Sequence, residues 1–159
     1  GEIFPIPEKT SGKSGARLMS LRHPEKKMSK SSDDINGTIY FNDEKDNILK
    51  KFKSSVTDSE NIVRYDLENK PGISNLIEIY AAVNDKEISE TEKEFENSQY
   101  GEFKVAVAET VIEYLDPIKK NFDDLTNDNL KDFAVSNIKS AKDSAQKTIN
   151  EVEEALGIS

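Results

Sequence analysis

Apolar residues recur every three to four positions through the later part of the chain, which is the spacing of amphipathic helices. One such pattern covers residues 103–125, and a longer one covers residues 130–156. Gly157 directly follows the second pattern and predicts its C-terminal stop. We expect both apolar stripes to be core, and we expect Pro117 to interrupt and kink the first of these helices.

Three shorter helices are predicted before these two. Asp43 is placed to cap the first, and Pro71 opens the second at a first-turn position that tolerates proline. Ser89 and Glu92 have the spacing of a capping box ahead of the third. The apolar positions of the first helix are Ile48, Leu49, Phe52 and Val56, and those of the second are Ile73, Leu76, Ile77 and Tyr80.

The N-terminal part of the chain has a different pattern. Residues 3–7 form an apolar run broken by two prolines, which predicts an edge strand or an extended lead-in. Residues 18–21 (Leu-Met-Ser-Leu) predict a short buried strand before a turn at His23-Pro24, and residues 38–41 form another short apolar run. So few strands cannot make a stable sheet, and we expect the apolar face of residues 18–21 to lack partners within this chain.

Charge is distributed unevenly along the 159 residues, whose net charge is −9. Residues 1–30 contain seven lysine or arginine residues and three glutamates, so a basic head precedes a strongly acidic body. This is consistent with binding of a polyanion at one end. The sequence has no membrane-spanning apolar stretch, no signal-peptide pattern and no cysteine, and we expect a cytoplasmic protein.

Several short motifs resemble known binding or catalytic sites but lack a residue that those sites require. Gly12-Lys13-Ser14 resembles the end of a phosphate-binding P-loop, but Pro7 occupies the position of the required first glycine. A calcium loop starting at Ser32 would have Asp43 where a bidentate glutamate is needed. His23 is the only histidine, so no zinc site or Ser-His-Asp triad is predicted, and we assign no metal-ligating residue.

The segment Lys27-Met28-Ser29-Lys30-Ser31 carries the clearest chemistry in the chain. Two ammonium groups with neighbouring hydroxyls form a compact cationic, donor-rich cluster, which suits a triphosphate whose charge shifts during reaction. An arbitrary pentamer of this composition would be a solvated basic turn. Here the neighbouring motifs decide between the two interpretations.

The pentamer is the KMSKS signature of class I aminoacyl-tRNA synthetases, and the motifs around it resemble those of bacterial tryptophanyl-tRNA synthetases. The resemblance covers essentially the whole chain. The tyrosine-specific family shares the loop, but the motif at residues 70–75 favours the tryptophan family. The stretches that carry the resemblance are Gly15-Ala16-Arg17-Leu18-Met19-Ser20-Leu21, Val56-Thr57-Asp58-Ser59, Ile62-Val63-Arg64-Tyr65-Asp66, Lys70-Pro71-Gly72-Ile73-Ser74-Asn75-Leu76, Tyr100-Gly101-Glu102-Phe103-Lys104 and Ala155-Leu156-Gly157.

The resemblance is to the C-terminal half of that family. The HIGH-like motif, the tryptophan pocket and the Gly-x-Asp-Gln-type ribose segment have no counterpart in this sequence. The resemblance implies a mainly α fold, in which residues 1–42 are the last part of a Rossmann-like catalytic domain with its KMSKS loop. Residues 43–159 are then the helical anticodon-binding domain. We therefore expect a piece of a longer protein.

The resemblance also implies a set of site residues. Lys27 and Lys30 are the catalytic residues, and Lys30 stabilises the departing pyrophosphate. Arg17, Arg22 and Lys26 are expected to be solvated or structural. The nucleotide-binding residues that it implies are Leu18, which corresponds to an aliphatic position beside the adenine, together with Lys27, Met28, Ser29, Lys30 and Ser31.

In the intact family the substrates are ATP with Mg²⁺, L-tryptophan and tRNA(Trp), and the enzyme is a homodimer. For this chain alone we expect no bound nucleotide and no tryptophan activation, because the amino-acid pocket is missing. We also expect the KMSKS loop to be poorly ordered, since its charges are useful only when it closes over ATP. The alternative is a stand-alone helical module that binds RNA or protein without catalysis.

Overall fold

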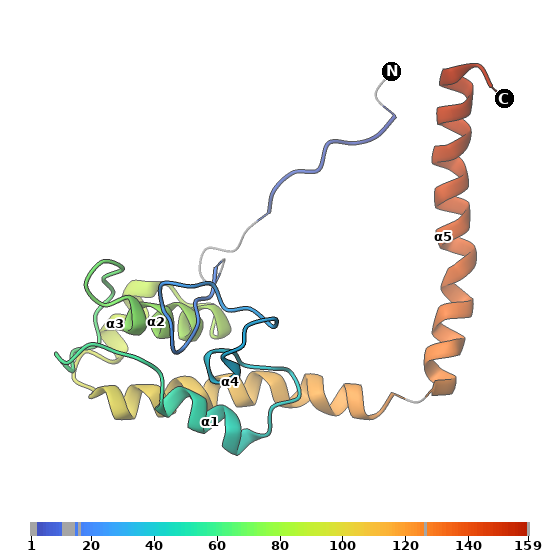
Figure 1. Ribbon diagram of the computed structural model, residues 1–159. Helices are drawn as coiled ribbons and strands as arrows, with labels where there is room; N and C mark the ends of the chain where they lie inside the picture. The colour runs from blue at the N-terminus through green and yellow to red at the C-terminus, as the bar shows by residue number, and fades with distance from the viewer. Residues whose placement is uncertain (1–2, 11–14, 16, 126, 159) are drawn as a thin grey trace. The chain divides into compact units, whose positions relative to one another are not determined.

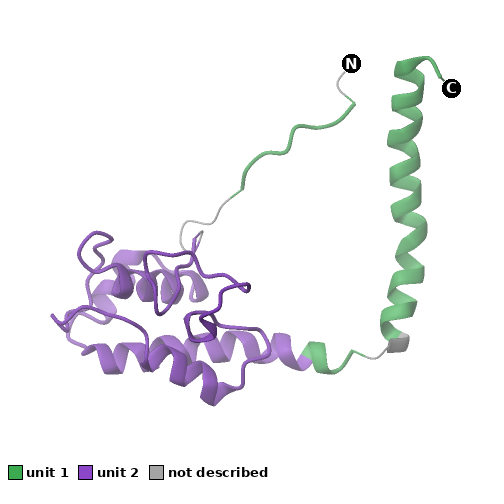
Figure 2. Ribbon diagram, viewed as in Figure 1, with its two compact units in different colours: residues 1–10, 121–159 green, residues 11–120 purple. Residues whose placement is uncertain are grey.

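The computed structural model describes residues 3–10, 15, 17–125 and 127–158. These residues form five α-helices and one short 3₁₀ helix, η1 (Ile35–Gly37) (Figure 1). They contain no β-strand, only one isolated antiparallel bridge between Met19 and Lys27. The prediction of a mainly α fold is therefore confirmed. The chain divides into two compact units, residues 11–120 and residues 1–10 with 121–159 (Figure 2).

The core of the unit formed by residues 11–120 lies among three helices. Its buried side chains come mainly from α1 (Lys45–Lys53), α2 (Pro71–Val83) and the first part of α4 (Tyr100–Asp123). α2 is the most buried element, and Pro71 at its first position has no N–H that would need a partner. The core residues from these helices include Ile48, Phe52, Ile73, Leu76, Ile77, Phe103 and Val107.

Asp43 has a different function from the predicted one. The N-cap of α1 is Glu44, and Asp43 instead lies buried just before the helix. Its carboxylate accepts hydrogen bonds from the backbone of Tyr40 (2.8 Å) and from Lys51 Nζ (2.6 Å). The prediction for Val56 was also wrong, because the helix ends at Lys53 and Val56 is 44% exposed.

The predicted capping box of the third helix was placed two residues too late. α3 (Ile88–Glu94) begins after Glu87, and the reciprocal capping bonds join Glu87 and Glu90. Glu92, by contrast, accepts a hydrogen bond from the backbone N–H of Tyr65 at 2.7 Å. Glu87 has the same spacing to Glu90 that Ser89 has to Glu92, so spacing alone did not identify the helix start.

α4 is more continuous than the sequence indicated. It runs through Pro117 without interruption, its fully buried residues end at Val111, and Ile112 and Leu115 pack against the core only partly buried. Beyond that point, the apolar side chains predicted to be core are partly or largely exposed; Tyr114, for example, is 55% exposed. Amphipathic spacing identified the apolar stripe, but it could not indicate how far along the helix the core extends.

α5 (Asn127–Leu156) confirms the second long helix but not its burial. Most of its described apolar side chains are exposed, with Phe133 at 70% and Ile138 at 49%, although Val152 is half-buried. Gly157 ends the helix in the left-handed conformation (φ +69°), and its N–H and that of Ile158 bond to the carbonyls of Glu154 and Glu153. This is the predicted glycine stop.

The N-terminal segments do not form strands. Residues 3–10 have no regular structure, and Phe4 and Ile6 are exposed. Residues 18–21 are extended, yet their apolar face has partners: Leu21 is 2% exposed, and Leu18 packs against the core. The expectation that this segment lacks partners was wrong, because the helices of the chain cover it. Residues 12–14 and Ala16 lie outside the described residues.

Gly72 offers a direct test of the packing between α2 and the chain after α1. A Cβ at this position would lie 2.1 Å from the carbonyl oxygen of Val56. We expect Gly72→Ala to lower the free energy of unfolding by about 1–3 kcal/mol, as overpacking typically does. Gly101→Ala is the matched control, since nothing lies within 4 Å of its Cβ position, and it should be neutral or stabilising. Urea denaturation measures both, and equal stability of the two variants would contradict this packing.

Candidate functional site

The candidate site is built on a short pair of extended segments. Residues 18–20 run antiparallel to residues 26–28 around a turn in which Lys26 N–H bonds to His23 C=O at 2.8 Å. Two backbone bonds join the segments: Ser20 N–H to Lys26 C=O at 2.8 Å and Met28 N–H to Leu18 C=O at 2.9 Å. The predicted turn at His23-Pro24 is confirmed, and it directs the chain into the KMSKS segment, residues 27–31.

Helix α2 holds the other edge of this pair. The side-chain amide of Asn75 donates to Met19 C=O at 2.8 Å and accepts from Met19 N–H at 2.8 Å. Asn75 is 3% exposed, so water does not compete for these bonds. The Asn75–Met19 pair therefore supplies what a neighbouring strand would supply to residue 19. From the sequence, Asn75 is only the last residue of the motif at residues 70–75 and has no assigned role, because its partner is 56 residues away.

One part of the KMSKS segment packs against the core, and the rest of it is exposed. Met28 is partly buried against the core, whereas Lys27 and Lys30 are exposed. The hydroxyls of Ser29 and Ser31 lie 3.1 Å apart, and Ser32 N–H bonds to Ser29 C=O at 3.2 Å, which makes a turn with Lys30 and Ser31 at its centre. The expected poor order of this loop stays a prediction.

A second set of contacts joins the loop to α1. Thr38 Oγ1 donates to Ser29 C=O at 3.1 Å, and the carbonyl of Thr38 accepts from Lys51 Nζ at 2.9 Å. Lys51 is 3% exposed and is neutralised by the carboxylate of Asp43. A buried lysine needs such a counter-charge. This contact and the Asn75–Met19 pair place the base of the loop between two helices.

The inner side of the loop encloses a hollow of about 380 Å³. Hydroxyls and ammonium groups predominate in its lining, although two aspartates also contribute. Such a lining can donate many hydrogen bonds to an anionic group. The residues that line it are Ser20, His23, Lys26, Lys27, Ser29, Ser32, Asp33, Asp34 and Thr38.

The structure brings most of the predicted site residues together. Lys27, Met28, Ser29, Lys30 and Ser31 are contiguous, and Leu18 is joined to Met28 by a backbone hydrogen bond. Leu18 is partly buried against the core. Lys27 and Ser29 line the hollow, and Lys30 is exposed in the adjoining turn.

Two other hollows carry less chemistry. One of about 660 Å³ lies on the Asn75 side of Met19 and includes Tyr65 and Glu78 in its lining. Burial and the Glu78 carboxylate, which accepts from the Tyr65 hydroxyl at 2.7 Å, raise the pKa of Tyr65 to about 12. Tyr65 is therefore a neutral phenol at physiological pH and not a base.

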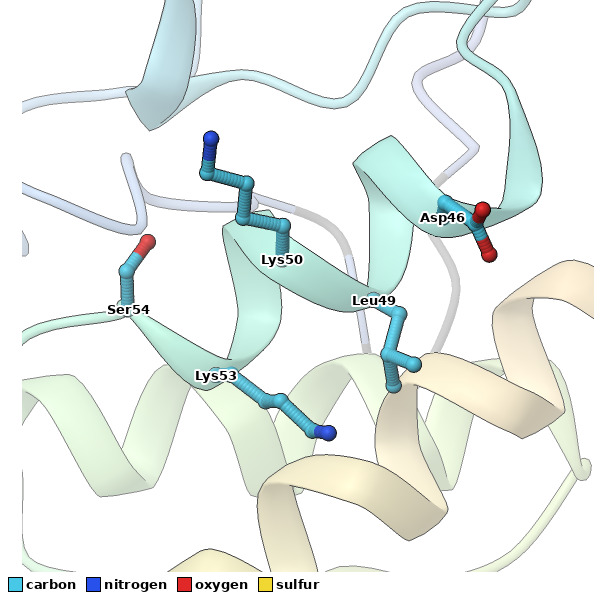
Figure 3. Close-up of a pocket in the computed structure, with 5 residues that line it drawn as sticks. All are labelled: Asp46, Leu49, Lys50, Lys53 and Ser54. Atoms are coloured by element: carbon cyan, nitrogen blue, oxygen red, sulfur yellow. The ribbon is translucent and has the colours of Figure 1, made fainter.

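The other hollow, of about 460 Å³, lies on the surface of α1. Its lining side chains come from that helix and from Ser54 directly after it, and Lys50 and Lys53 point in different directions (Figure 3). Two lysines that do not converge are typical of a solvated helix face. We assign no reaction to this hollow.

A polar cluster around the buried Lys70 side chain joins the start of α2 to the start of α4. Lys70 Nζ, in a side chain that is 1% exposed, donates to Asp58 (2.9 Å), Glu60 (2.7 Å) and Tyr100 (3.0 Å). The Tyr100 hydroxyl also contacts both Asp58 oxygens, at 2.7 and 2.8 Å. Every member has a partner, so this cluster connects elements and is not a reactive centre.

Burial and hydrogen bonding oppose each other in this cluster. Burial disfavours the charged form of Asp58, but the hydrogen bonds from Lys70 and Tyr100 outweigh it and hold the pKa of Asp58 below 3.8. Burial likewise opposes the charge of Lys70, yet its bonds to Glu60, Tyr100 and Asp58 raise the pKa of Lys70 above 10.5. Both groups are ionised at neutral pH.

The described part of the chain has neither a membrane-spanning helix nor a metal-binding cluster. No helix there is long and apolar enough to cross a bilayer. No group of three or more histidine and acidic side chains there is arranged to hold a metal ion.

Comparison with known families agrees with this geometry. The model of the class I tRNA synthetases (W and Y) matches residues 1–116. This chain belongs to that family of aminoacyl-tRNA synthetases.

Its relatives specify the family further. The tryptophan–tRNA ligases of Oceanobacillus iheyensis and Bacillus subtilis are 44% and 42% identical to it over 158 residues, which are 99% of this chain and 48% of each relative. The crystal structure of tryptophanyl-tRNA synthetase from Mycoplasma pneumoniae is similar with a TM-score of 0.84 at 27% identity, over 93% of this chain and 45% of that one. The chain thus spans about half the length of the relatives it matches. These are tryptophan enzymes, as the motif at residues 70–75 predicted.

The low pKa of Asp58 predicts how stability depends on pH. A carboxylate whose pKa is lower in the folded than in the unfolded state stabilises the fold above its unfolded pKa, and this contribution is lost as pH falls through the folded pKa. We expect unfolding free energy to decrease below about pH 4, and to decrease less in Asp58→Asn. Urea denaturation at pH 6 and pH 3 measures this difference. Asp33→Asn, at an exposed position, is the control, and an equal pH dependence in both variants would contradict the cluster.

Proposed function

We propose that this chain is the C-terminal half of a tryptophan–tRNA ligase. In this proposal it supplies the KMSKS loop for ATP and a helical domain for tRNA(Trp), and residues 1–42 and 43–159 belong to those two parts. The observation that carries the proposal is the KMSKS segment, held at its base by two helices and lined by hydroxyls and lysines, in a member of the class I family. The names of the relatives support tryptophan as the amino acid.

The first chemical step is the activation of tryptophan. A carboxylate oxygen of tryptophan attacks the α-phosphorus of ATP, the bond from that phosphorus to the bridging oxygen breaks, and pyrophosphate leaves with the bonding electrons. The negative charge on the leaving group grows during this step, so nearby cations lower the barrier. We assign this charge stabilisation to Lys30, with Lys27 as the second phosphate contact.

The remaining loop residues position the nucleotide in this proposal. Ser29 and Ser31 donate hydrogen bonds to phosphate oxygens, Met28 lies near the nucleotide, and Leu18 contacts the adenine. ATP is bound with Mg²⁺ as the substrate complex, and the ion shares the neutralisation of the phosphates with the two lysines. Exposure of the turn around Lys30 leaves this part of the loop free to approach a bound triphosphate.

The second step transfers the tryptophanyl group. A hydroxyl of the 3′-terminal ribose of tRNA(Trp) attacks the acyl carbon of the adenylate, and AMP leaves. We propose that helices of residues 43–159 recognise the anticodon through unstacked bases, a mode in which an acidic net charge is tolerated. The intact enzyme is a homodimer of the cytoplasm in this proposal, and the tryptophan pocket lies outside this chain.

Substitution of the loop lysines tests the function. In the full-length protein, we expect Lys30→Ala to reduce kcat of tryptophan-dependent ATP–pyrophosphate exchange by about 10²–10³-fold, as the loss of one transition-state contact typically does. Lys27→Ala should also reduce it, and the KM for tryptophan should change little. Lys53→Ala, which removes an exposed lysine of α1 outside the loop, is the control. Activity of Lys30→Ala within twofold of the wild-type protein would overturn the assignment.

The assignment of the chain to the C-terminal half of the enzyme gives a separate test. This chain alone should show no tryptophan-dependent exchange, because tryptophan has no pocket in it under this proposal. Clear exchange activity of the purified 159-residue chain would contradict the assignment to the C-terminal half.

A further inference from the structure

We propose that Asn75 is a positioning residue that couples helix α2 to the KMSKS loop by holding the backbone of Met19. The inference rests on the proposed function only in that the loop is taken to act on ATP. The coupling itself follows from the hydrogen bonds of this chain.

Residues 18–20 bond to two different neighbours in alternation. The N–H and C=O of Met19 point to Asn75, at 2.8 Å each. The flanking groups point the other way: Leu18 C=O accepts from Met28 N–H, and Ser20 N–H donates to Lys26 C=O. The three-residue segment is therefore a bridge with α2 on one edge and the start of the KMSKS segment on the other.

An asparagine is chemically suited to this position. Met19 presents one donor and one acceptor, and a side-chain amide offers the complementary acceptor and donor in one plane. A carboxylate in place of the amide would keep only an acceptor, which is why Asn75→Asp is informative below. Alanine would leave the N–H and C=O of Met19 without these partners in a site that excludes water, and an unpaired buried peptide group is destabilising.

The position of α2 determines where the bridge lies. α2 is buried along most of its length, with Ile73, Leu76 and Ile77 each at most 1% exposed, so Asn75 moves only when the helix moves. The second hold on the loop, from Thr38 to Ser29, comes from the α1 side. In the sequence, Lys30 comes after both of the residues that these contacts hold, and it is exposed. The helices therefore fix the backbone from which Lys30 would reach a phosphate.

Ser74 provides a matched control on the same helix. Its buried hydroxyl accepts from Asp66 N–H at 2.8 Å, a side-chain-to-backbone bond of the same length as those of Asn75, although its partner is only eight residues away. That bond joins α2 to residues 57–70 and makes no contact with the KMSKS loop. Ser74→Ala therefore reports the cost of losing a buried side-chain bond on α2 without loss of the coupling.

Amide hydrogen exchange of this chain tests the coupling directly. In Asn75→Ala we expect the N–H groups of Ser20 and Met28, which face the loop and do not touch Asn75, to exchange about tenfold faster or more. In Ser74→Ala they should exchange at the wild-type rate. Unchanged exchange at both amides in Asn75→Ala, or equal acceleration in the two variants, would overturn the proposal.

Asn75→Asp keeps the proposal testable if the alanine variant does not fold. It preserves the side-chain volume and the acceptor for Met19 N–H, and it loses the donor to Met19 C=O. The same two amides should exchange faster, by a smaller factor than in the alanine variant. Wild-type exchange rates in a folded Asn75→Asp protein would count against the coupling.

Kinetics of the full-length protein test the consequence for the reaction. Because a displacement of about 1 Å can cost about 10²-fold in rate, we expect Asn75→Ala to lower kcat of tryptophan-dependent pyrophosphate exchange by about 10–100-fold, with the KM for tryptophan unchanged. Ser74→Ala should keep kcat within about threefold. A fall of kcat in both variants alike would mean a general loss of structure and would overturn the positioning role.

The two measurements test different claims, so the proposed function and the coupling can be refuted independently. If the wild-type full-length protein shows no pyrophosphate exchange, the proposed function fails, while hydrogen exchange in this chain still decides whether Asn75 holds the loop. If hydrogen exchange at Ser20 and Met28 does not respond to Asn75, the coupling is refuted whether or not the protein is a ligase.

Discussion

The pair of hydrogen bonds between the Asn75 side chain and the Met19 backbone is the constraint on which the rest of the site depends. Residues 18–20 have a strand-like shape without a sheet, and an isolated pair of extended segments is only marginally stable in water. Asn75 supplies the missing edge from inside the most buried helix of the chain. The KMSKS segment then leaves this bridge in a defined direction, although the segment itself is largely exposed.

Buried charges join the same elements in a complementary way. Lys51 with Asp43 connects α1 to Thr38 and so to the far side of the loop, and Lys70 with Asp58 connects the starts of α2 and α4. Loss of one partner would leave an uncompensated charge in a largely buried site, so each pair stabilises the arrangement in which both partners are in contact. Lys27 and Lys30, to which we assign the phosphate contacts, are the opposite case, because both are exposed.

Local sequence signals predicted where the helices lie better than they predicted the contacts between the helices. Pro71 and Gly157 marked an actual helix start and stop, because each acts through its own backbone conformation. Asp43 and Ser89 did not act as caps, because α1 begins after Glu44 and α3 begins after Glu87. The stripe of α5 identified a helix but not burial, because amphipathic spacing does not specify what covers a face. The KMSKS motif located the candidate site, whereas Asn75 could not be found by spacing, because its partner lies 56 residues away.

Nuclear magnetic resonance of the isotopically labelled chain tests the central constraint most directly. The measurement is the exchange rate of the Asn75 side-chain NH₂ protons, together with the scalar coupling across the hydrogen bond from Asn75 Nδ2 to the Met19 carbonyl carbon. We predict a resolved coupling and exchange much slower than for Asn97, which is exposed. No coupling, with Asn75 protons that exchange as fast as those of Asn97, would contradict the account.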